Sequence, residues 1–360
     1  MSGVADEVVH LPVPTLPSSL PPTALGGASP LADQHGRVAT DLRVSLTDRC
    51  NLRCSYCMPA EGLDWMATEQ TLTDDEVVRL VVLGIERLGI REVRFTGGEP
   101  LVRRGLVDIV RQVRERSAEV EMSLTTNALG LARTADALAE AGLDRVNVSL
   151  DSIRAETYAT ITRRDRMHDA IAGIEAAVAA GITPIKINAV LLRGLNDTEA
   201  PELVRWSLER GYELRFIEQM PLDAQHAWTR EHMITADEIL ASLEAVYDVR
   251  PDGEARGSAP AERFLVDTGD GVAGRVGVIG SVTRPFCGDC DRVRLTADGQ
   301  VRNCLFARTE SDLRASLRGG ASDDEIVDRW RTAMWGKAPG HGIDDPSFLQ
   351  PTRPMSAIGG

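Results

Sequence analysis

Short runs of β-branched residues alternate with longer helical stretches along this chain from residue 42 to about residue 252. This alternation predicts repeated strand–helix units and a parallel sheet, because parallel neighbours need a crossover connection. We expect six strands, at residues 42–47, 92–96, 121–126, 145–150, 184–190 and 213–218. Six units fall short of the eight that close a full barrel. The predicted fold class is therefore α/β, a partial (β/α)6 TIM-type barrel whose open side needs a cover.

The texture of the sequence changes after the barrel pattern to Gly-rich, alternating segments. We expect strands at residues 263–266, 275–279, 293–296 and 301–306, with the last two joined as a hairpin by Ala297-Asp298-Gly299, and a helix at 323–334. These elements predict a C-terminal α+β domain that binds a cluster and covers the open side. The expected domains are a disordered leader at 1–36, the barrel at 37–252, the C-terminal domain at 253–340 and a tail at 341–360 that ends in Gly-Gly.

Composition excludes several classes of function. At 360 residues with 43% apolar residues, the chain can bury a large core without disulfides. The net charge of −14 disfavours nucleic acid and anionic membrane as partners. The sequence shows no secretory signal and no run of roughly 18 apolar residues, so we expect a cytoplasmic protein. An anionic substrate would need its own local cations.

The six cysteines fall into two sets of three: Cys50, Cys54 and Cys57, then Cys287, Cys290 and Cys304. Iron–sulfur clusters usually take four thiolates, so a cluster with three protein ligands keeps one iron open to a small molecule. Zinc is the alternative at each set. The first set would need a distant fourth ligand, and the second would need Asp289 or Asp291.

The first set, Cys50-x-x-x-Cys54-x-x-Cys57, directly follows a predicted strand and resembles the radical S-adenosylmethionine (SAM) superfamily. The resemblance implies a [4Fe-4S] cluster whose open iron chelates SAM, and reductive cleavage of SAM to a 5′-deoxyadenosyl radical. Tyr56 lies where the superfamily places an aromatic residue beside the adenine. Gly97-Gly98-Glu99-Pro100 resembles the loop that binds the SAM amino group.

With the second set included, residues 41–360 resemble the GTP cyclases of molybdenum-cofactor biosynthesis. The motifs that carry this resemblance are Asp41-Leu42-Arg43-Val44-Ser45, Val93-Arg94-Phe95-Thr96, Asn147-Val148-Ser149-Leu150-Asp151, Lys186-Ile187-Asn188, Phe216-Ile217-Glu218-Gln219-Met220-Pro221, Cys287-Gly288-Asp289-Cys290-Asp291-Arg292-Val293-Arg294 and Gly359-Gly360. Gln219 and Ala357 depart from the family pattern, which has an aromatic residue at each position.

The resemblance implies two [4Fe-4S] clusters, each with three of the cysteines as metal ligands, and it implies a role for each matching residue. The implied GTP contacts are Arg43, Arg94, Thr125, Lys186, Arg292, Val293 and Arg294, of which Arg43, Arg292 and Arg294 are also assigned as catalytic. The implied SAM contacts are Tyr56, Gly98, Ser149 and Met220. The sequence pattern independently supports a binding role for three of these cations. Arg43, Arg94 and Lys186 lie within strands predicted to line a barrel, where an unpaired charge is costly.

The implied reaction joins ribose C3′ of GTP to guanine C8. It gives (8S)-3′,8-cyclo-7,8-dihydroguanosine 5′-triphosphate, the first step of molybdenum cofactor (molybdopterin) biosynthesis. The implied partners are an external one-electron reductant and a downstream enzyme that takes the product, and a homodimer is one assembly open to the chain. The resemblance also places the Gly359-Gly360 tail in the active site, with Arg353 as a candidate member of the phosphate cluster.

Two alternatives remain open from the sequence. One is a radical SAM enzyme that modifies peptides and uses an auxiliary iron–sulfur cluster, which would call for a peptide-recognition domain. The other is a zinc-binding non-enzymatic module, such as a scaffold or an RNA-binding module.

Overall fold

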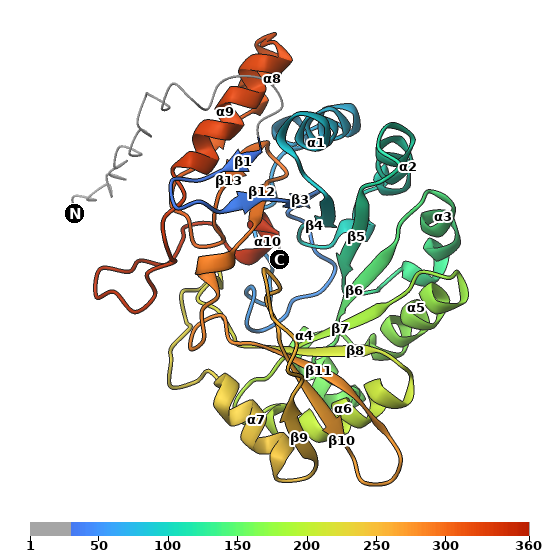
Figure 1. The fold of residues 1–360 in the computed structure, drawn as a ribbon. Coiled ribbons are helices and arrows are strands. Elements are labelled where there is room, and N and C mark those ends of the chain that lie inside the picture. Colours follow the sequence, from blue (N-terminus) through green and yellow to red (C-terminus); the bar gives the residue numbers. More distant parts are fainter. Residues whose placement is uncertain (1–29, 360) are drawn as a thin grey trace, which may run out of the picture.

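The computed structural model describes residues 30–359, so most of the expected leader lies outside the described residues. All six expected barrel strands are present and pair in parallel in chain order. They are β3 (Asp41–Ser45), β4 (Glu92–Thr96), β5 (Glu121–Thr126), β6 (Arg145–Ser149), β7 (Ile185–Val190) and β8 (Glu213–Ile217). Helices cover the outside of this curved sheet (Figure 1). They are α1 (Asp74–Leu88), α2 (Leu106–Arg116), α3 (Ala135–Glu140), α4 (Ala155–Thr162), α5 (Met167–Ala179) and α6 (Ala200–Glu209).

Local sequence sets the bounds of α1. Thr73 and Glu76 form a capping box at its start, and Gly89 ends it with a left-handed φ of 78°. The helix buries Val77 and Val81 against the outer face of the sheet. Apolar residues at helical spacing therefore hold α1 on the barrel.

Side chains on the barrel strands alternate between the helix-facing side and the inside of the barrel. On β3, Leu42 and Val44 are fully buried in the core, whereas Arg43 lines an internal cavity. The register pairs Arg43 with Arg94 on β4 and with Arg294 on the C-terminal strand β12 (Arg292–Leu295). Arginines that are far apart in the sequence thus stand side by side inside the barrel.

The C-terminal region adds strands to both edges of the barrel sheet. β11 (Ala273–Ile279) pairs in parallel with β8, and β12 pairs in parallel with β3. The remaining strands continue the sheet outward from these two and are β9 (Asp248–Pro251), β10 (Glu262–Asp267), β13 (Gln300–Arg302) and β14 (Ser311–Asp312). Within the described residues the result is one sheet of 12 strands. The C-terminal region therefore shares the barrel's sheet and forms none of its own.

The expected C-terminal elements are confirmed with one correction. The hairpin at residues 297–299 joins β12 to β13, and the expected helix is α9 (Asp323–Trp335). The strand expected at 301–306 is too long, because β13 ends at Arg302 and the chain then turns. Asn303 stabilises this turn by donating a hydrogen bond to the Ala333 carbonyl at 2.8 Å.

The remaining helices are α7 (Ala236–Glu244), α8 (Arg314–Arg318) and α10 (Met355–Ile358). The chain ends in the middle of the ring of barrel strands, directly after α10 (Figure 1). Among the described residues, no helix combines the length and apolar character that crossing a membrane requires.

The expected leader boundary at residue 36 is wrong for residues 30–36. β1 (Leu31–Ala32) pairs antiparallel with β2 (Val38–Ala39), and Leu31 is fully buried. The Arg37 guanidinium donates hydrogen bonds to the carbonyls of Cys287 and Ala338 at 2.7 and 2.6 Å. These long-range contacts fasten the hairpin to the C-terminal region.

Candidate active site

The first cysteine set lies in the loop after β3. Cys50, Cys54 and Cys57 line one cavity of about 150 Å³, and all three are free thiols. The Leu52 N–H and the Asn127 side-chain amide approach the Cys50 sulfur at 3.5 and 4.0 Å. Burial raises the pKa of Cys50 to about 11 and that of Cys57 to about 12. Buried thiolates need a bound cation here, so the donor set suits iron, which takes thiolate ligands.

Two glycines after β4 let a second loop pack against this cysteine loop. A Cβ on Gly98 would lie 2.4 Å from the carbonyl oxygens of Asp48 and Arg49, and Gly97 has a φ of 145°. The Gly98 N–H donates to the Thr47 carbonyl at 2.7 Å. Glycine is therefore required at position 98 by the close approach of two backbones, whatever else binds there.

Tyr56 connects the cysteine loop to the end of β6. Its hydroxyl donates a 2.9 Å hydrogen bond to Asp151, whose other oxygen accepts a 2.9 Å bond from the Val190 N–H. Burial raises the pKa of Asp151 to about 6. Of the expected SAM contacts, Tyr56, Gly98 and Ser149 line the cavity of the first cysteine set. Met220 lines a larger neighbouring cavity instead.

The second cysteine set faces this larger cavity, which has a volume of about 270 Å³. Cys287, Cys290 and Cys304 line it together. Burial acts to raise the pKa of Cys290, but the charges of Arg292 and Lys337 outweigh burial and lower it to about 7. This environment favours a thiolate and thus fits a metal ligand.

The fourth ligands that the sequence suggested for a zinc site at the second set lie outside its cavity. Asp289 and Asp291, the expected fourth ligands for zinc, do not line the cavity. In the part of the chain that the structure describes, no three His, Cys, Asp or Glu side chains form a group that could hold a single metal ion.

The cavities of the two cysteine sets are neighbours inside the barrel and share part of their walls. Tyr56, Thr125, Ser149 and Asp151 line the cavity of the first set and also that of the second. A ligand in the larger cavity would therefore lie between the two sets of thiols.

Five arginines line the larger cavity. Arg215 comes from β8, and the other four come from three adjacent strands: Arg43, Arg94, Arg292 and Arg294. The Asp41 carboxylate lies 3.5 Å from Arg43 and 3.8 Å from Arg94. Burial acts to raise the pKa of Asp41, but the four arginines lower it below its usual value. Asp41 and Asp151 are the buried carboxylates at this cavity, and the arginines outnumber them, so the cavity suits a polyanion.

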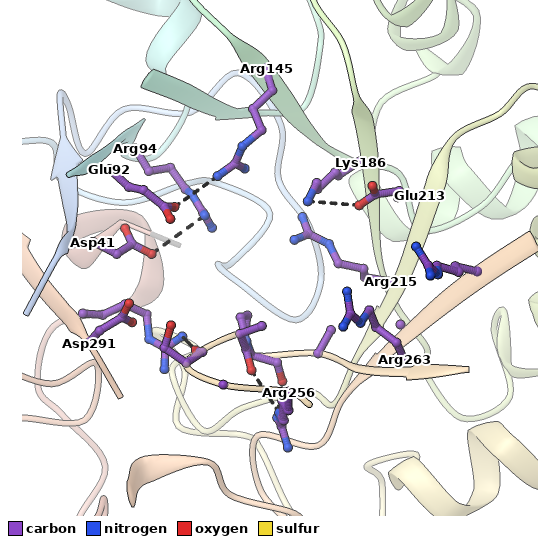
Figure 2. Close-up of a pocket in the computed structure, with 18 of the residues that line it drawn as sticks. Asp41, Glu92, Arg94, Arg145, Lys186, Glu213, Arg215, Arg256, Arg263 and Asp291 are labelled. Atoms are coloured by element: carbon purple, nitrogen blue, oxygen red, sulfur yellow. Dashed lines mark hydrogen bonds and ion pairs between the residues drawn. The ribbon is translucent and has the colours of Figure 1, made fainter. Parts of the chain in front are cut away.

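A further cavity of about 560 Å³ opens where the barrel strands begin. Both acidic and basic side chains line it, and they include Asp41, Glu92, Arg94, Arg145, Lys186, Glu213 and Arg215 (Figure 2). Lys186 pairs with Glu213 at 3.0 Å. Three arginines line both this cavity and the 270 Å³ cavity of the second cysteine set, so the two cavities adjoin at these side chains. They are Arg94, Arg215 and Arg292.

The sequence interpretation missed Arg215 and Asn147. Arg215 donates a 2.8 Å hydrogen bond to the Asn147 side-chain oxygen, and burial lowers the pKa of Arg215 to about 10. The alternation of side chains along β8 could have indicated that Arg215 faces the inside of the barrel. Leu214 and Phe216 are fully buried toward the helices, which points Arg215 inward.

Three expected substrate residues lie outside the cavity of the second cysteine set. Lys186 lines only the 560 Å³ cavity where the strands begin. Val293 is fully buried in the helix-facing core, so its side chain does not reach the cavity. Arg353 does not join the inner arginines, because it pairs with Asp298 at 2.7 Å and with Glu310 at 2.9 Å.

The C-terminal tail does reach the inner arginines. The Gly359 carbonyl accepts a hydrogen bond from Arg294. A Cβ on Gly359 would lie 2.7 Å from the Thr96 side chain, so the narrow passage favours glycine. Ile358 is fully buried beside Leu222 and Phe306. Gln219 is one of the two residues that depart from the family pattern. Its main-chain carbonyl accepts a 2.8 Å hydrogen bond from the Trp228 indole.

Comparisons with known proteins agree with this geometry. The family model of the radical SAM superfamily matches residues 44–207, and the model described as Molybdenum Cofactor Synthesis C matches residues 212–343. A GTP 3′,8-cyclase of Streptomyces coelicolor is 64% identical over 93% of this chain and 97% of that protein. One from a Mycobacterium species is 59% identical over 98% of this chain and 99% of that protein.

Among solved structures, SuiB of Streptococcus suis bound to S-adenosylmethionine is similar in fold. Its TM-score is 0.57 at 14% identity, covering 84% of this chain and 67% of that chain. At this identity the likeness concerns the fold alone.

A partial parallel barrel with three cysteines after its first strand defines the class, which is a radical SAM enzyme. The near full-length relatives then narrow the class. The chain belongs to the family of GTP 3′,8-cyclases.

Proposed function

We propose that this enzyme converts GTP to (8S)-3′,8-cyclo-7,8-dihydroguanosine 5′-triphosphate, the first step of molybdenum cofactor biosynthesis. One observation carries the proposal: the two cysteine sets line neighbouring cavities that share wall residues, and five arginines line the cavity of the second set. A nucleoside triphosphate needs cations at one end and a metal or hydrogen-bonding wall at the other. The cavity of the second set offers both.

Cys50, Cys54 and Cys57 would hold one [4Fe-4S] cluster, and Cys287, Cys290 and Cys304 a second. When bound, the first cluster together with SAM supplies the radical that removes hydrogen from ribose C3′, and the second offers an open iron to the guanine. Tyr56, Gly98 and Ser149 line the smaller cavity, where they would contact SAM. Met220 would contact SAM from the larger cavity.

The protein's own part in the reaction is to place GTP. Arg43, Arg292 and Arg294 are the proposed catalytic residues, and with Arg94 they bind the triphosphate by charge-assisted hydrogen bonds. Thr125 and Lys186 complete the GTP contacts, and Val293 contributes only its main chain. Holding GTP beside SAM turns the hydrogen transfer between two molecules into an oriented step within one complex, which gives a large gain in effective molarity.

The Gly359-Gly360 tail and α10 would exclude water from the reaction. Arg294 holds the tail through the Gly359 carbonyl. Excluding water and other hydrogen donors protects a carbon radical until the new bond forms.

An external one-electron reductant and a downstream enzyme complete the proposed partners, and a homodimer is the proposed assembly. Six free thiols need a reducing compartment, which supports a cytoplasmic location.

Anaerobic incubation with SAM, dithionite and GTP tests the proposal, with the nucleotides separated by chromatography before mass analysis. We expect 5′-deoxyadenosine and a nucleotide of unchanged mass whose ribose is cyclised to the base. Protein that contains zinc and no acid-labile sulfide would instead support the zinc-binding module. Cleavage of SAM with GTP unchanged would point to the peptide-modifying alternative, which does not call for the arginine set.

A further inference from the structure

A buried lysine contacts the second cysteine set. Lys337 follows the end of α9, and its side chain is only 2% exposed. Its ammonium donates hydrogen bonds to the Cys290 carbonyl at 3.1 Å, the Cys290 sulfur at 3.3 Å and the Arg292 carbonyl at 2.9 Å. An ammonium has three N–H donors. All three are directed at the segment that carries Cys290.

The composition of the chain makes this lysine unusual. Lys186 and Lys337 are the only lysines in the sequence, although it contains 40 Lys and Arg residues together. Nearly every cation is therefore arginine, whose planar fork suits carboxylates and phosphates. The three acceptors around Lys337 instead suit a compact ammonium with donors in three directions. Lysine thus stands where the local geometry demands it.

The charge of Lys337 lacks a carboxylate partner. Among the described residues, no Asp or Glu forms an ion pair with its ammonium. Burying an unpaired cation is costly unless an anion lies close. The Cys290 sulfur lies 3.3 Å from the ammonium and becomes fully anionic when it ligates a metal.

We propose that Lys337 is a positioning residue for the second cluster, which it orients through Cys290 and whose reduction potential it raises. This inference rests on the proposed second cluster. Hydrogen bonds to ligand sulfurs and nearby positive charge stabilise the reduced, more negative form of an iron–sulfur cluster. Through the Arg292 carbonyl, the same ammonium also fixes the start of β12, which carries Arg292 and Arg294. Lys337 thereby links the cluster to the substrate-binding arginines.

The test compares Lys337→Met, Lys337→Arg and the control Arg329→Met in anaerobically purified full-length protein. Arg329 is exposed on α9, the helix that precedes Lys337. Its replacement therefore removes one positive charge without changing a contact to the cysteine segment. Potentiometric titration followed by EPR would measure the midpoint potential of the cluster signal that GTP perturbs. We expect a more negative potential in Lys337→Met, partial recovery in Lys337→Arg and the wild-type potential in Arg329→Met.

A second readout uses the scarcity of lysine. Protein labelled with 15N-lysine should show a 15N hyperfine coupling to the reduced second cluster in pulsed EPR, and Lys337→Arg should lose it. An unchanged potential in Lys337→Met together with no 15N coupling would overturn the inference and leave Lys337 as a purely structural tie.

Iron content separates failure of the inference from failure of the proposed function. Wild-type protein with two [4Fe-4S] clusters contains about eight iron atoms per chain. Wild-type protein with about four iron atoms, or with no EPR signal that responds to GTP, would overturn the second cluster itself and the inference with it.

Discussion

The Tyr56 hydroxyl donates a 2.9 Å hydrogen bond to the Asp151 carboxylate, and this contact joins the first cysteine loop to the end of β6. Both residues line the cavity of the first cysteine set and the larger cavity beside it. The bond therefore lies between the proposed SAM site and the proposed GTP site, where it holds the cysteine loop against the barrel.

Replacing Tyr56 with Phe should keep the ring and remove this hydrogen bond. The loss leaves one oxygen of a buried carboxylate without its donor, so we expect the free energy of unfolding to fall by about 1–3 kcal/mol. The KM for SAM should rise, because the cysteine loop is less firmly held. Thermal unfolding and initial rates of 5′-deoxyadenosine formation check both effects. A variant with the wild-type melting temperature and KM would contradict this role.

Replacing Cys54 with Ala should abolish reductive cleavage of SAM. The cavity of the first set would keep only two thiols, too few to hold the proposed cluster. Iron content should fall by about half, and 5′-deoxyadenosine should be absent from anaerobic assays with dithionite. SAM cleavage at the wild-type rate would show that these three cysteines do not hold the cluster.

Replacing Cys290 with Ala should give the complementary result. SAM cleavage should survive in part, because the first triplet is intact, whereas cyclisation of GTP should be lost because the base is no longer held. Anaerobic product analysis with equilibrium binding of GTP measures the two separately. Unchanged GTP binding would argue against a substrate role for the second cluster.

Arg94 and Arg353 form a matched pair of arginines. Arg94→Met should weaken GTP binding by about 10–100-fold, since one charge-assisted contact to phosphate is lost. Arg353→Met should leave GTP affinity unchanged and lower the free energy of unfolding by about 1–3 kcal/mol, since Asp298 and Glu310 lose their partner. Isothermal calorimetry and thermal unfolding would distinguish the two variants. Weaker GTP binding by the Arg353 variant would indicate that Arg353 contacts the phosphates after all.

Asp41→Asn should make the stability of the protein depend more strongly on GTP. Asp41 is a buried anion beside four inner arginines, so its loss should lower the melting temperature, and bound triphosphate should restore more of it than in the wild type. The lowered pKa of Asp41 sets the pH dependence. Its stabilisation is present above the unfolded pKa of about 4 and is lost as pH falls through the folded value. Equal GTP-induced melting shifts in both proteins would contradict this prediction.

Much of the barrel could be predicted from local patterns. β-branched runs and capped helices placed six strands, and period-two alternation placed Arg43 and Arg94 on the inner face. The same alternation in β8 indicates that Arg215 points inward. The sequence analysis did not predict this position because no motif includes Arg215. Local propensity and side-chain periodicity reside in neighbouring residues, so a single sequence carries them.

The spacing of the cysteines and the alternation of strands and helices were thus determined by the sequence itself. The tertiary structure decided which distant segments meet. β12 lies beside β3, the two cysteine sets line neighbouring cavities, Arg353 pairs with Asp298, and Lys337 contacts the Cys290 sulfur. Contacts between residues tens or hundreds of positions apart depend on how the whole core packs and how buried charges find partners. No local pattern encodes that outcome.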